Sequence, residues 1–370
     1  MDVEMGKSGR KSTAKPQLGG KRGRRGLWRL PLTVGGCFIA LFIFFVFMGS
    51  GGGSGSSSSR RPGRLSGASV AHGGWGALPD PDGQPRVYRF RVLRELPHDH
   101  RAFTQGLQFD RICDGESRSN CREVFWESTG LNGQSTVREV DAESGKVLRK
   151  KDLPTSDFGE GVARHGDRLY QVTWQGPKTW SYSVSDLEDA RELATPLKDG
   201  WGITSDGSHL IVGDSTDKLT WLDPADVSRA VREVAVKDGG QAVRWLNELE
   251  WADGLVWANV WMTDCIAQVD PASGAVVGWV RFGGLRERAV AAAAEDARAS
   301  GEGQRPQREQ PEVLNGIAWD EQGRRLFVTG KLWPRIYQVE LEEVPAGEAG
   351  AALAAARREC IPQGDLRGFF

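Results

Sequence analysis

Short runs of alternating apolar and polar residues recur along the middle of the chain. One pattern, a small or polar residue followed by alternating apolar positions, occurs five times. Its copies are TQGLQFD (104–110), GEGVARH (159–165), GWGITSD (200–206), LNELEWA (246–252) and LNGIAWD (314–320). After a turn comes a second apolar run: VFWESTG (124–130), RLYQVTW (168–174), HLIVGDS (209–215), LVWANVW (255–261) or RLFVTGK (325–331). Period-two patterning with Asp, Gly and Pro in the turns predicts antiparallel strands.

The spacing of the copies predicts how the strands are organised. The third residue of each copy is an anchor, and the anchors are Gly106, Gly161, Gly202, Glu248 and Gly316. Successive anchors are 55, 41, 46 and 68 residues apart, which suits a four-stranded unit with insertions. The last copy ends one strand short, and an unassigned strand, RVYRFRVLREL (86–96), precedes the first. We therefore predict an all-β, five-bladed β-propeller over residues 86–345 whose N-terminal strand completes the last blade.

The segments around the repeats have biased composition. Residues 49–85 form a Gly/Ser-rich stretch, which predicts a flexible tether. Residues 286–311, rich in Ala, Glu and Arg, are predicted to be a low-complexity insertion that forms a solvated helix or stays disordered. Residues 346–370 are similar and are predicted to be a C-terminal tail, so both segments are expected at the periphery.

The N-terminal region has the pattern of a membrane anchor. Residues 30–48 carry no charge and are long enough for one transmembrane helix, although a cleaved signal peptide is the competing interpretation. Residues 1–29 hold nine Lys or Arg against two acidic residues and are predicted to be a cytosolic tail. We expect a single-pass type II membrane protein of the secretory pathway, in the Golgi or endoplasmic reticulum, with its catalytic domain in the lumen.

Composition and charge narrow the class of function. The 48 glycines and 14 tryptophans suit tight turns and aromatic interiors. The chain carries a net charge of −1, which leaves −8 after residue 29 and argues against a nucleic-acid partner. Cys113 and Cys121 are close enough for a disulfide, whereas Cys265 and Cys360 either pair or stay free.

The repeats nominate a site, because the first strands of propeller blades line a common channel. The residues before the anchors differ in chemistry; they are Gln105, Glu160, Trp201, Asn247 and Asn315. The ends of the second runs offer Glu127, Trp174, Asp214, Trp261 and Lys331. The tryptophans are typical of core filling when taken one by one, but together with one carboxylate and one ammonium they indicate an apolar pocket with a few polar groups. The sequence contains no zinc-hydrolase HExxH, no GxSxG and no P-loop, so those classes lack their motifs.

These strings resemble a known family. FTQGLQFD, ESTGLNGQSTVREVD, FGEGV, DRLYQVTW, KDGWGI, RWLNELEW, VWANVW, DCIAQVDP, VLNGIAWD and VTGKLWP, in this order over residues 87–343, are similar to the glutaminyl cyclotransferases of the plant and bacterial type. The resemblance implies a five-bladed propeller that converts N-terminal glutamine of peptides and proteins to pyroglutamate with release of ammonia. It also implies that no catalytic zinc is used, while a structural metal ion is left open, and we expect a monomer.

The resemblance also implies roles for particular residues. Glu160 is similar to the family's catalytic carboxylate, which moves protons, and Lys331 would stabilise the developing oxyanion. The predicted substrate-binding residues are Phe103, Gln105, Phe158, Trp174, Trp201, Asn247 and Trp261, with Glu248, Glu250 and Asn315 as rivals to the amides. Two alternatives stay open at this point: a non-catalytic propeller that binds peptides or glycans in its aromatic channel, and a metal-dependent lactonase.

Overall fold

A computed structural model of the chain describes residues 79–80, 82–113, 121–301, 309–364 and 366. All of them belong to the unit that spans Val70–Phe370. The predicted cytosolic tail, membrane span and most of the tether lie outside the described residues. Within the described ranges, neither helix has the length and apolarity that crossing a bilayer requires.

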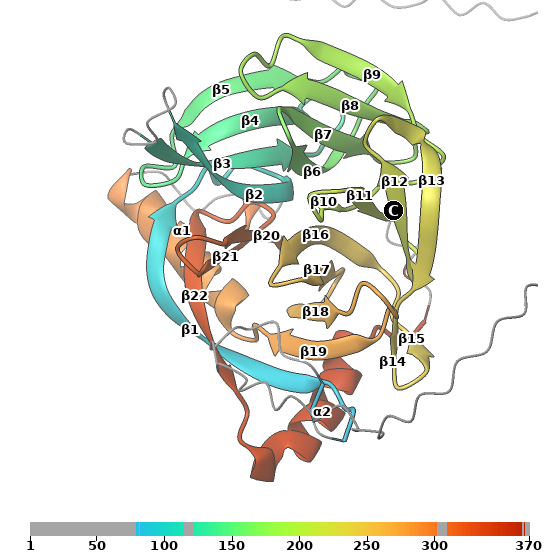
Figure 1. The fold of residues 1–370 in the computed structure, drawn as a ribbon. Helices are drawn as coiled ribbons and strands as arrows, with labels where there is room; N and C mark the ends of the chain where they lie inside the picture. The colour runs from blue at the N-terminus through green and yellow to red at the C-terminus, as the bar shows by residue number, and fades with distance from the viewer. Residues whose placement is uncertain (1–78, 81, 114–120, 302–308, 365, 367–370) are drawn as a thin grey trace, which may run out of the picture. The chain divides into compact units, whose positions relative to one another are not determined.

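The described chain is an all-β, propeller-like fold built mostly from four-stranded antiparallel groups (Figure 1). The first group comprises β2 (Thr104–Cys113), β3 (Cys121–Thr129), β4 (Thr136–Asp141) and β5 (Val147–Asp152). The second comprises β6 (Gly159–His165), β7 (Arg168–Thr173), β8 (Lys178–Ser183) and β9 (Ala190–Ala194). The third comprises β10 (Ile203–Ser205), β11 (Leu210–Gly213), β12 (Lys218–Asp223) and β13 (Asp226–Ala235).

The remaining strands form one eight-stranded sheet and a small hairpin. The sheet runs from β16 (Leu246–Ala252), β17 (Leu255–Val260), β18 (Cys265–Val269) and β19 (Val276–Arg281) through β1 (Arg86–Pro97) to β22 (Arg335–Glu343), β21 (Arg325–Gly330) and β20 (Leu314–Asp320). The hairpin is β14 (Lys237–Asp238) and β15 (Gln241–Ala242). The strand at 86–96 pairs antiparallel with β22 as predicted, and its first three residues also pair parallel with β19, which joins the last two groups.

The first strands of the groups form a closed ring. Strand β2 contacts β6, β6 contacts β10, β10 contacts β16, β16 contacts β20, and β20 contacts β2. These strands face a common centre in Figure 1, whereas β5, β9, β13 and β19 lie on the outside. The five repeats of the sequence therefore correspond to the five inner strands.

The glycine anchors are explained by how closely the inner strands approach. A Cβ added at Gly106 would lie 2.3 Å from the Val162 nitrogen, and one at Gly202 would lie 2.0 Å from the Asn247 oxygen. Gly161 meets the backbone of Ile203 in the same way, at 2.7 Å. Because the opposing atoms belong to the backbone, they cannot rotate away, so only glycine fits at these positions.

Two segments expected at the periphery form helices that pack on the sheets. Helix α1 (Leu285–Ala299) covers the first part of the predicted insertion and buries a face that includes Leu285, Ala289 and Ala293. It is therefore a helix, as one of the two predicted alternatives had it, but one face is buried instead of solvated. Small alanine side chains let it lie close to its neighbours, and Asp296 pairs with Arg335 of β22.

The C-terminal segment is also more than the predicted tail. Helix α2 (Ala346–Cys360) buries Leu353, Ala356 and Cys360 in the largest apolar cluster that the described residues form. Cys360 forms a disulfide with Cys265 of β18, which settles the alternative left open for this pair, and Cys113 is bonded to Cys121 as predicted. The sequence did not predict this packing, because an alanine-rich helix presents a small-residue face that composition alone does not distinguish from a solvated one.

We predict that Gly202→Ala disrupts the ring of inner strands. The added methyl group overlaps the backbone of β16, and overpacking costs about 1–3 kcal/mol even where side chains can adjust. The free energy of unfolding, measured by denaturant titration, should fall by at least about 3 kcal/mol. Gly283→Ala is the matched control, since nothing lies within 4 Å of its added Cβ. Equal stability of the two variants would contradict the close-approach argument.

Candidate active site

The hairpins between first and second strands bring the predicted site residues to one mouth of the ring. The start of each inner strand pairs with the end of the second strand; Gly159 lies opposite Thr173, and Leu314 lies opposite Gly330. Residues early in the inner strands therefore lie beside the residues that directly follow the second strands. Trp174, Trp261 and Lys331 each stand in that following position.

All nine residues predicted for the site line a single cavity of about 370 Å³. They are Phe103, Gln105, Phe158, Glu160, Trp174, Trp201, Asn247, Trp261 and Lys331. The same cavity is also lined by Met262, Glu312 and Val313, which the sequence analysis missed. Their position was a usable signal, because Met262 follows Trp261 and the other two directly precede β20.

Glu160 is a buried carboxyl group held by the amide of Gln105. Its side-chain oxygen accepts a hydrogen bond of 3.2 Å from Gln105 Nε2. Asn315 Nδ2 donates to Gln105 Oε1 at 3.1 Å, which fixes the orientation of that amide. Burial raises the pKa of Glu160 well above its ordinary value, Lys331 acts to lower it, and Asp199 adds to the rise.

Lys331 supplies a buried positive charge. Its Nζ lies 4.8 Å from the centre of the Phe103 ring, a cation–π contact. Burial lowers the pKa of this ammonium group, while Glu160 and Glu312 act to raise it. The acid and the cation therefore influence each other across the cavity, and each makes the charged form of the other more favourable.

Aromatic side chains form the walls. Phe158 packs edge-on against Phe103, with ring centres 6.2 Å apart, and against Trp174, at 5.5 Å. On another wall Trp201 packs against Trp261 at 5.6 Å. Such walls exclude water and lower the local dielectric, which strengthens the interactions of Glu160 and Lys331.

Asn247 presents an unused polar atom. Its side-chain oxygen is buried and accepts no hydrogen bond from any of the described residues. A buried polar atom without a partner is costly, so such atoms in native proteins call for an explanation. A donor on a bound molecule would satisfy this oxygen.

Three residues that the sequence offered as alternatives to Gln105 and Asn247 do not line the cavity. Asn315 bonds to Gln105 from behind, and Glu248 accepts hydrogen bonds from the backbone nitrogens of Leu107, at 3.3 Å, and Ile317, at 2.9 Å. Glu250 accepts one from Trp319 at 2.9 Å. Both glutamates thus link β16 to other inner strands. Burial raises the pKa of Glu250 to about 8, although the hydrogen bond from the Trp319 nitrogen acts to lower it.

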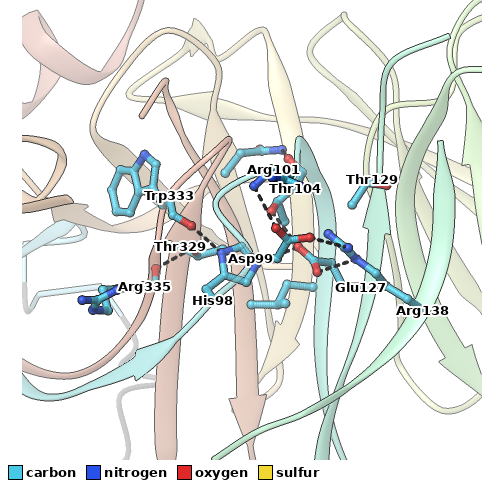
Figure 2. A network of polar contacts seen from close by, with 12 residues as sticks. His98, Asp99, Arg101, Thr104, Glu127, Thr129, Arg138, Thr329, Trp333 and Arg335 are labelled. Carbon is cyan, nitrogen blue, oxygen red and sulfur yellow. Dashed lines mark hydrogen bonds and ion pairs between the residues drawn. The ribbon is translucent and has the colours of Figure 1, made fainter. Parts of the chain in front are cut away.

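Glu127 lies near the end of β3, the second strand of the first group, and belongs to a separate polar network (Figure 2). Its carboxylate is bonded to His98 Nε2 at 2.9 Å, to Thr104 Oγ1 at 2.7 Å and to Arg138 Nε at 2.9 Å. Although burial acts to raise its pKa, Arg138 and His98 hold it at about 2. Since His98 Nδ1 also bonds the carbonyl oxygen of Trp333 at 2.7 Å, this network anchors the turn that follows Lys331.

The arrangement offers one carboxyl group with a raised pKa, one ammonium group and the amides of Gln105 and Asn247 in an apolar cavity. Among the described residues, no group of three or more His, Cys, Asp or Glu side chains is placed to hold a metal ion. A site of this composition can move a proton and stabilise a developing negative charge.

The chain is similar in sequence and in structure to known proteins. The sequence model of the glutamine cyclotransferase family matches residues 68–341. A glutaminyl-peptide cyclotransferase of Arabidopsis thaliana is 37% identical over 261 residues, which cover 70% of this chain and 74% of that protein. The crystal structure of a glutaminyl cyclase from Myxococcus xanthus matches with a TM-score of 0.57 and 34% identity, over 71% of this chain and all of that one.

We predict that Glu250→Gln changes how stability depends on pH. The unfolded carboxyl group loses its proton near pH 4.5, whereas the folded one keeps it until about pH 8. Unfolding therefore releases a proton between these values, and the free energy of unfolding falls as pH rises, by about 1.4 kcal/mol per pH unit at most. Denaturant titrations at pH 5 and pH 8 should show a smaller loss of stability on raising the pH in Glu250→Gln than in the wild type. The same loss in both proteins would contradict the raised pKa.

Proposed function

The chain belongs to the glutamine cyclotransferase family, and from this premise we propose how its cavity performs the reaction. The protein is a glutaminyl-peptide cyclotransferase, an acyltransferase that converts N-terminal glutamine to pyroglutamate and releases ammonia. The observation that supports the mechanism is the buried Glu160, whose pKa is raised, in the same aromatic cavity as Lys331.

Glu160 acts as the proton carrier in this proposal. The neutral α-amine of the substrate attacks its own side-chain carbonyl carbon, a new C–N bond forms, and the carbonyl oxygen takes up negative charge. The Glu160 carboxylate accepts a proton from the attacking nitrogen and returns it to the amide nitrogen. The C–N bond to that nitrogen then breaks, and ammonia leaves. A pKa raised above the ordinary value of a carboxyl group suits both transfers, because the same group must accept and donate.

Lys331 stabilises the oxyanion of the tetrahedral intermediate. Its ammonium group is buried, so little water competes with the oxyanion for it. The Phe103 ring beneath Nζ keeps the charge in the cavity without neutralising it. An exposed lysine would contribute less, since water would screen the charge.

The remaining residues hold the glutamine in a folded conformation. Gln105 and Asn247 bind the amide and amine, and the free oxygen of Asn247 accepts one of these hydrogen bonds. Phe103, Phe158, Trp174, Trp201 and Trp261 surround the aliphatic part and exclude water, so ring closure competes well with hydrolysis. Because nucleophile and electrophile belong to the same residue, positioning supplies much of the rate.

We further propose that the five groups of strands are the blades of a five-bladed propeller and that the reaction uses no metal ion. The closed ring of inner strands supports the first point. The second is supported by Glu160 and Lys331, which together supply the proton transfer and the positive charge. Activity that persists in excess chelator would agree with the second point, and its loss would favour the lactonase-like alternative.

For location, we propose a monomeric type II membrane protein with a lumenal catalytic domain, in the Golgi or endoplasmic reticulum. The uncharged segment at 30–48 and the basic residues before it support this orientation. The two disulfides fit an oxidising compartment.

The first prediction from this mechanism concerns the proton carrier. Glu160→Gln should lower kcat for a Gln-initiated peptide by about 10²–10⁴-fold, because the amide cannot accept the proton. Ammonia release by residues 70–370 is the measurement. Glu295→Gln, an exposed glutamate of α1, is the control and should retain turnover. Wild-type turnover in Glu160→Gln would reject the mechanism, and binding of peptides without any turnover in the wild type would favour the non-catalytic alternative.

The second prediction concerns the acid limb of the pH profile. The negative charge of Asp199 helps to raise the pKa of Glu160, so Asp199→Asn should move the acid limb of kcat/KM to lower pH. Deprotonation of the substrate amine also shapes the acid limb, but it does so equally in the wild type and in Asp199→Asn. Asn at 199 can still accept the hydrogen bond from the Gln175 nitrogen. Asp186→Asn also removes a carboxylate that accepts a backbone hydrogen bond, but at a different turn, and should leave the limb in place. A limb that does not move in Asp199→Asn, or moves up, would contradict the assignment to Glu160.

A further inference from the structure

A second hollow adjoins the reaction cavity. It has a volume of about 720 Å³ and shares Phe103 and Glu312 with the first cavity. Leu131 and Leu332 supply apolar surface, and Arg101 and Gln134 add polar groups. None of these last four residues lines the reaction cavity.

The two leucines occupy equivalent positions in the repeat. In four of the five groups, the residue two places after the second strand has a positive φ and is not glycine. These residues are Leu131 (φ 80°), Gln175 (φ 50°), Met262 (φ 64°) and Leu332 (φ 63°). The turn therefore demands a left-handed conformation in which glycine or asparagine costs least.

The side chains at these turns are informative because the backbone conformation favours glycine or asparagine, whereas the chain has leucine, methionine or glutamine there. A left-handed residue other than Gly, Asn or Asp costs roughly 1–2 kcal/mol, and such strain concentrates at functional sites. Leu131 and Leu332 line the second hollow, and Met262 lines the reaction cavity with 46% of its surface exposed. Gln175 lines neither cavity. Large apolar side chains thus stand at the turns that border the two cavities.

We propose that the second hollow binds residues two and three of the peptide substrate, and that Leu131 makes the enzyme prefer apolar side chains there. This inference rests on the proposed function, in which the glutamine fills the first cavity. The carbonyl group of that glutamine continues into the rest of the peptide, and the wall formed by Phe103 and Glu312 is shared by both spaces. A volume of this size is typical of ligand sites, which span roughly 300–1,000 Å³.

The polar groups of the hollow carry both signs of charge. Arg101 lies in the same lining as Glu309, Glu312 and His100, so its effect on a charged side chain opposes that of the two carboxylates. Their donors and acceptors, with those of Gln134, suit the peptide groups of an extended backbone. The apolar side chains therefore discriminate among substrates, and the polar ones bind what all peptides share.

The test compares three substrates on each enzyme: glutamine amide, Gln-Ser-Ser-amide and Gln-Leu-Leu-amide. For the wild type, kcat/KM should be about fivefold higher for the leucine peptide than for the serine peptide, as expected for partial burial of leucine. Leu131→Asn should reduce this preference to below about twofold, mainly through KM, and leave glutamine amide unchanged. Asparagine tolerates the left-handed turn, and the backbone oxygen at 131 keeps its hydrogen bond from the Gln134 nitrogen.

The controls separate this inference from the proposed function. Gln175→Asn alters the equivalent turn of the next group, outside both cavities, and should keep the wild-type preference. Because each preference is a ratio measured on one preparation, a partly unfolded variant still reports it, and Leu131→Gly provides a second test of the same wall. No cyclisation of any substrate by the wild type would reject the proposed function. Cyclisation with equal kcat/KM for the two tripeptides, or a preference that survives Leu131→Asn and Leu131→Gly, would reject the second site alone.

Discussion

The close approach of the five inner strands is the constraint on which the rest of the structure depends. At Gly106, Gly161 and Gly202 the neighbouring backbone lies where a Cβ would be, so the ring can close only without side chains at these points. At the fourth anchor, Glu248 of β16 instead receives hydrogen bonds from the backbone of two other inner strands, β2 and β20. The ring is thus held together by backbone contact on one side and by a buried carboxyl group on the other.

This closure produces the chemistry of the cavity. Because neighbouring residues of a strand face opposite sides, the residue before each anchor is directed away from the crowded contact between strands. Gln105, Glu160 and Asn247 all hold this position, although they lie far apart in the sequence. The hairpin register then places Trp174, Trp261 and Lys331 beside them. The tight ring therefore yields a water-poor cavity whose polar groups come from separate strands.

The sequence predicted the features that depend on local pattern. The alternation and spacing of the repeats predicted the inner strands and the partner of β1, and all nine site residues lie around one cavity. The packing of α2 and the pairing of Cys265 with Cys360 were not predictable, because an alanine-rich helix gives no sign of which surface it covers. Glu248 and Glu250 were weighed as rivals of Asn247, but alternation along β16 places Glu248 on the opposite side of the strand. The second hollow was missed because φ angles at turns are not visible in a sequence that uses leucine where glycine would fit.

Four buried glutamates show that burial alone does not make a catalytic acid. Glu127 stays ionised, with a pKa near 2, because Arg138 and His98 contact it directly. Glu250 has a pKa near 8 and Glu248 also has a raised pKa, but their oxygens are occupied by backbone nitrogens of the ring. Glu160 differs from all three. Its pKa is raised, but the positive charge of Lys331 acts to limit that rise. Its side chain also lines the cavity, where a substrate can reach it. A group that must both accept and release a proton needs this intermediate state, because full ion pairing would fix it as a carboxylate and full enclosure would keep the substrate away.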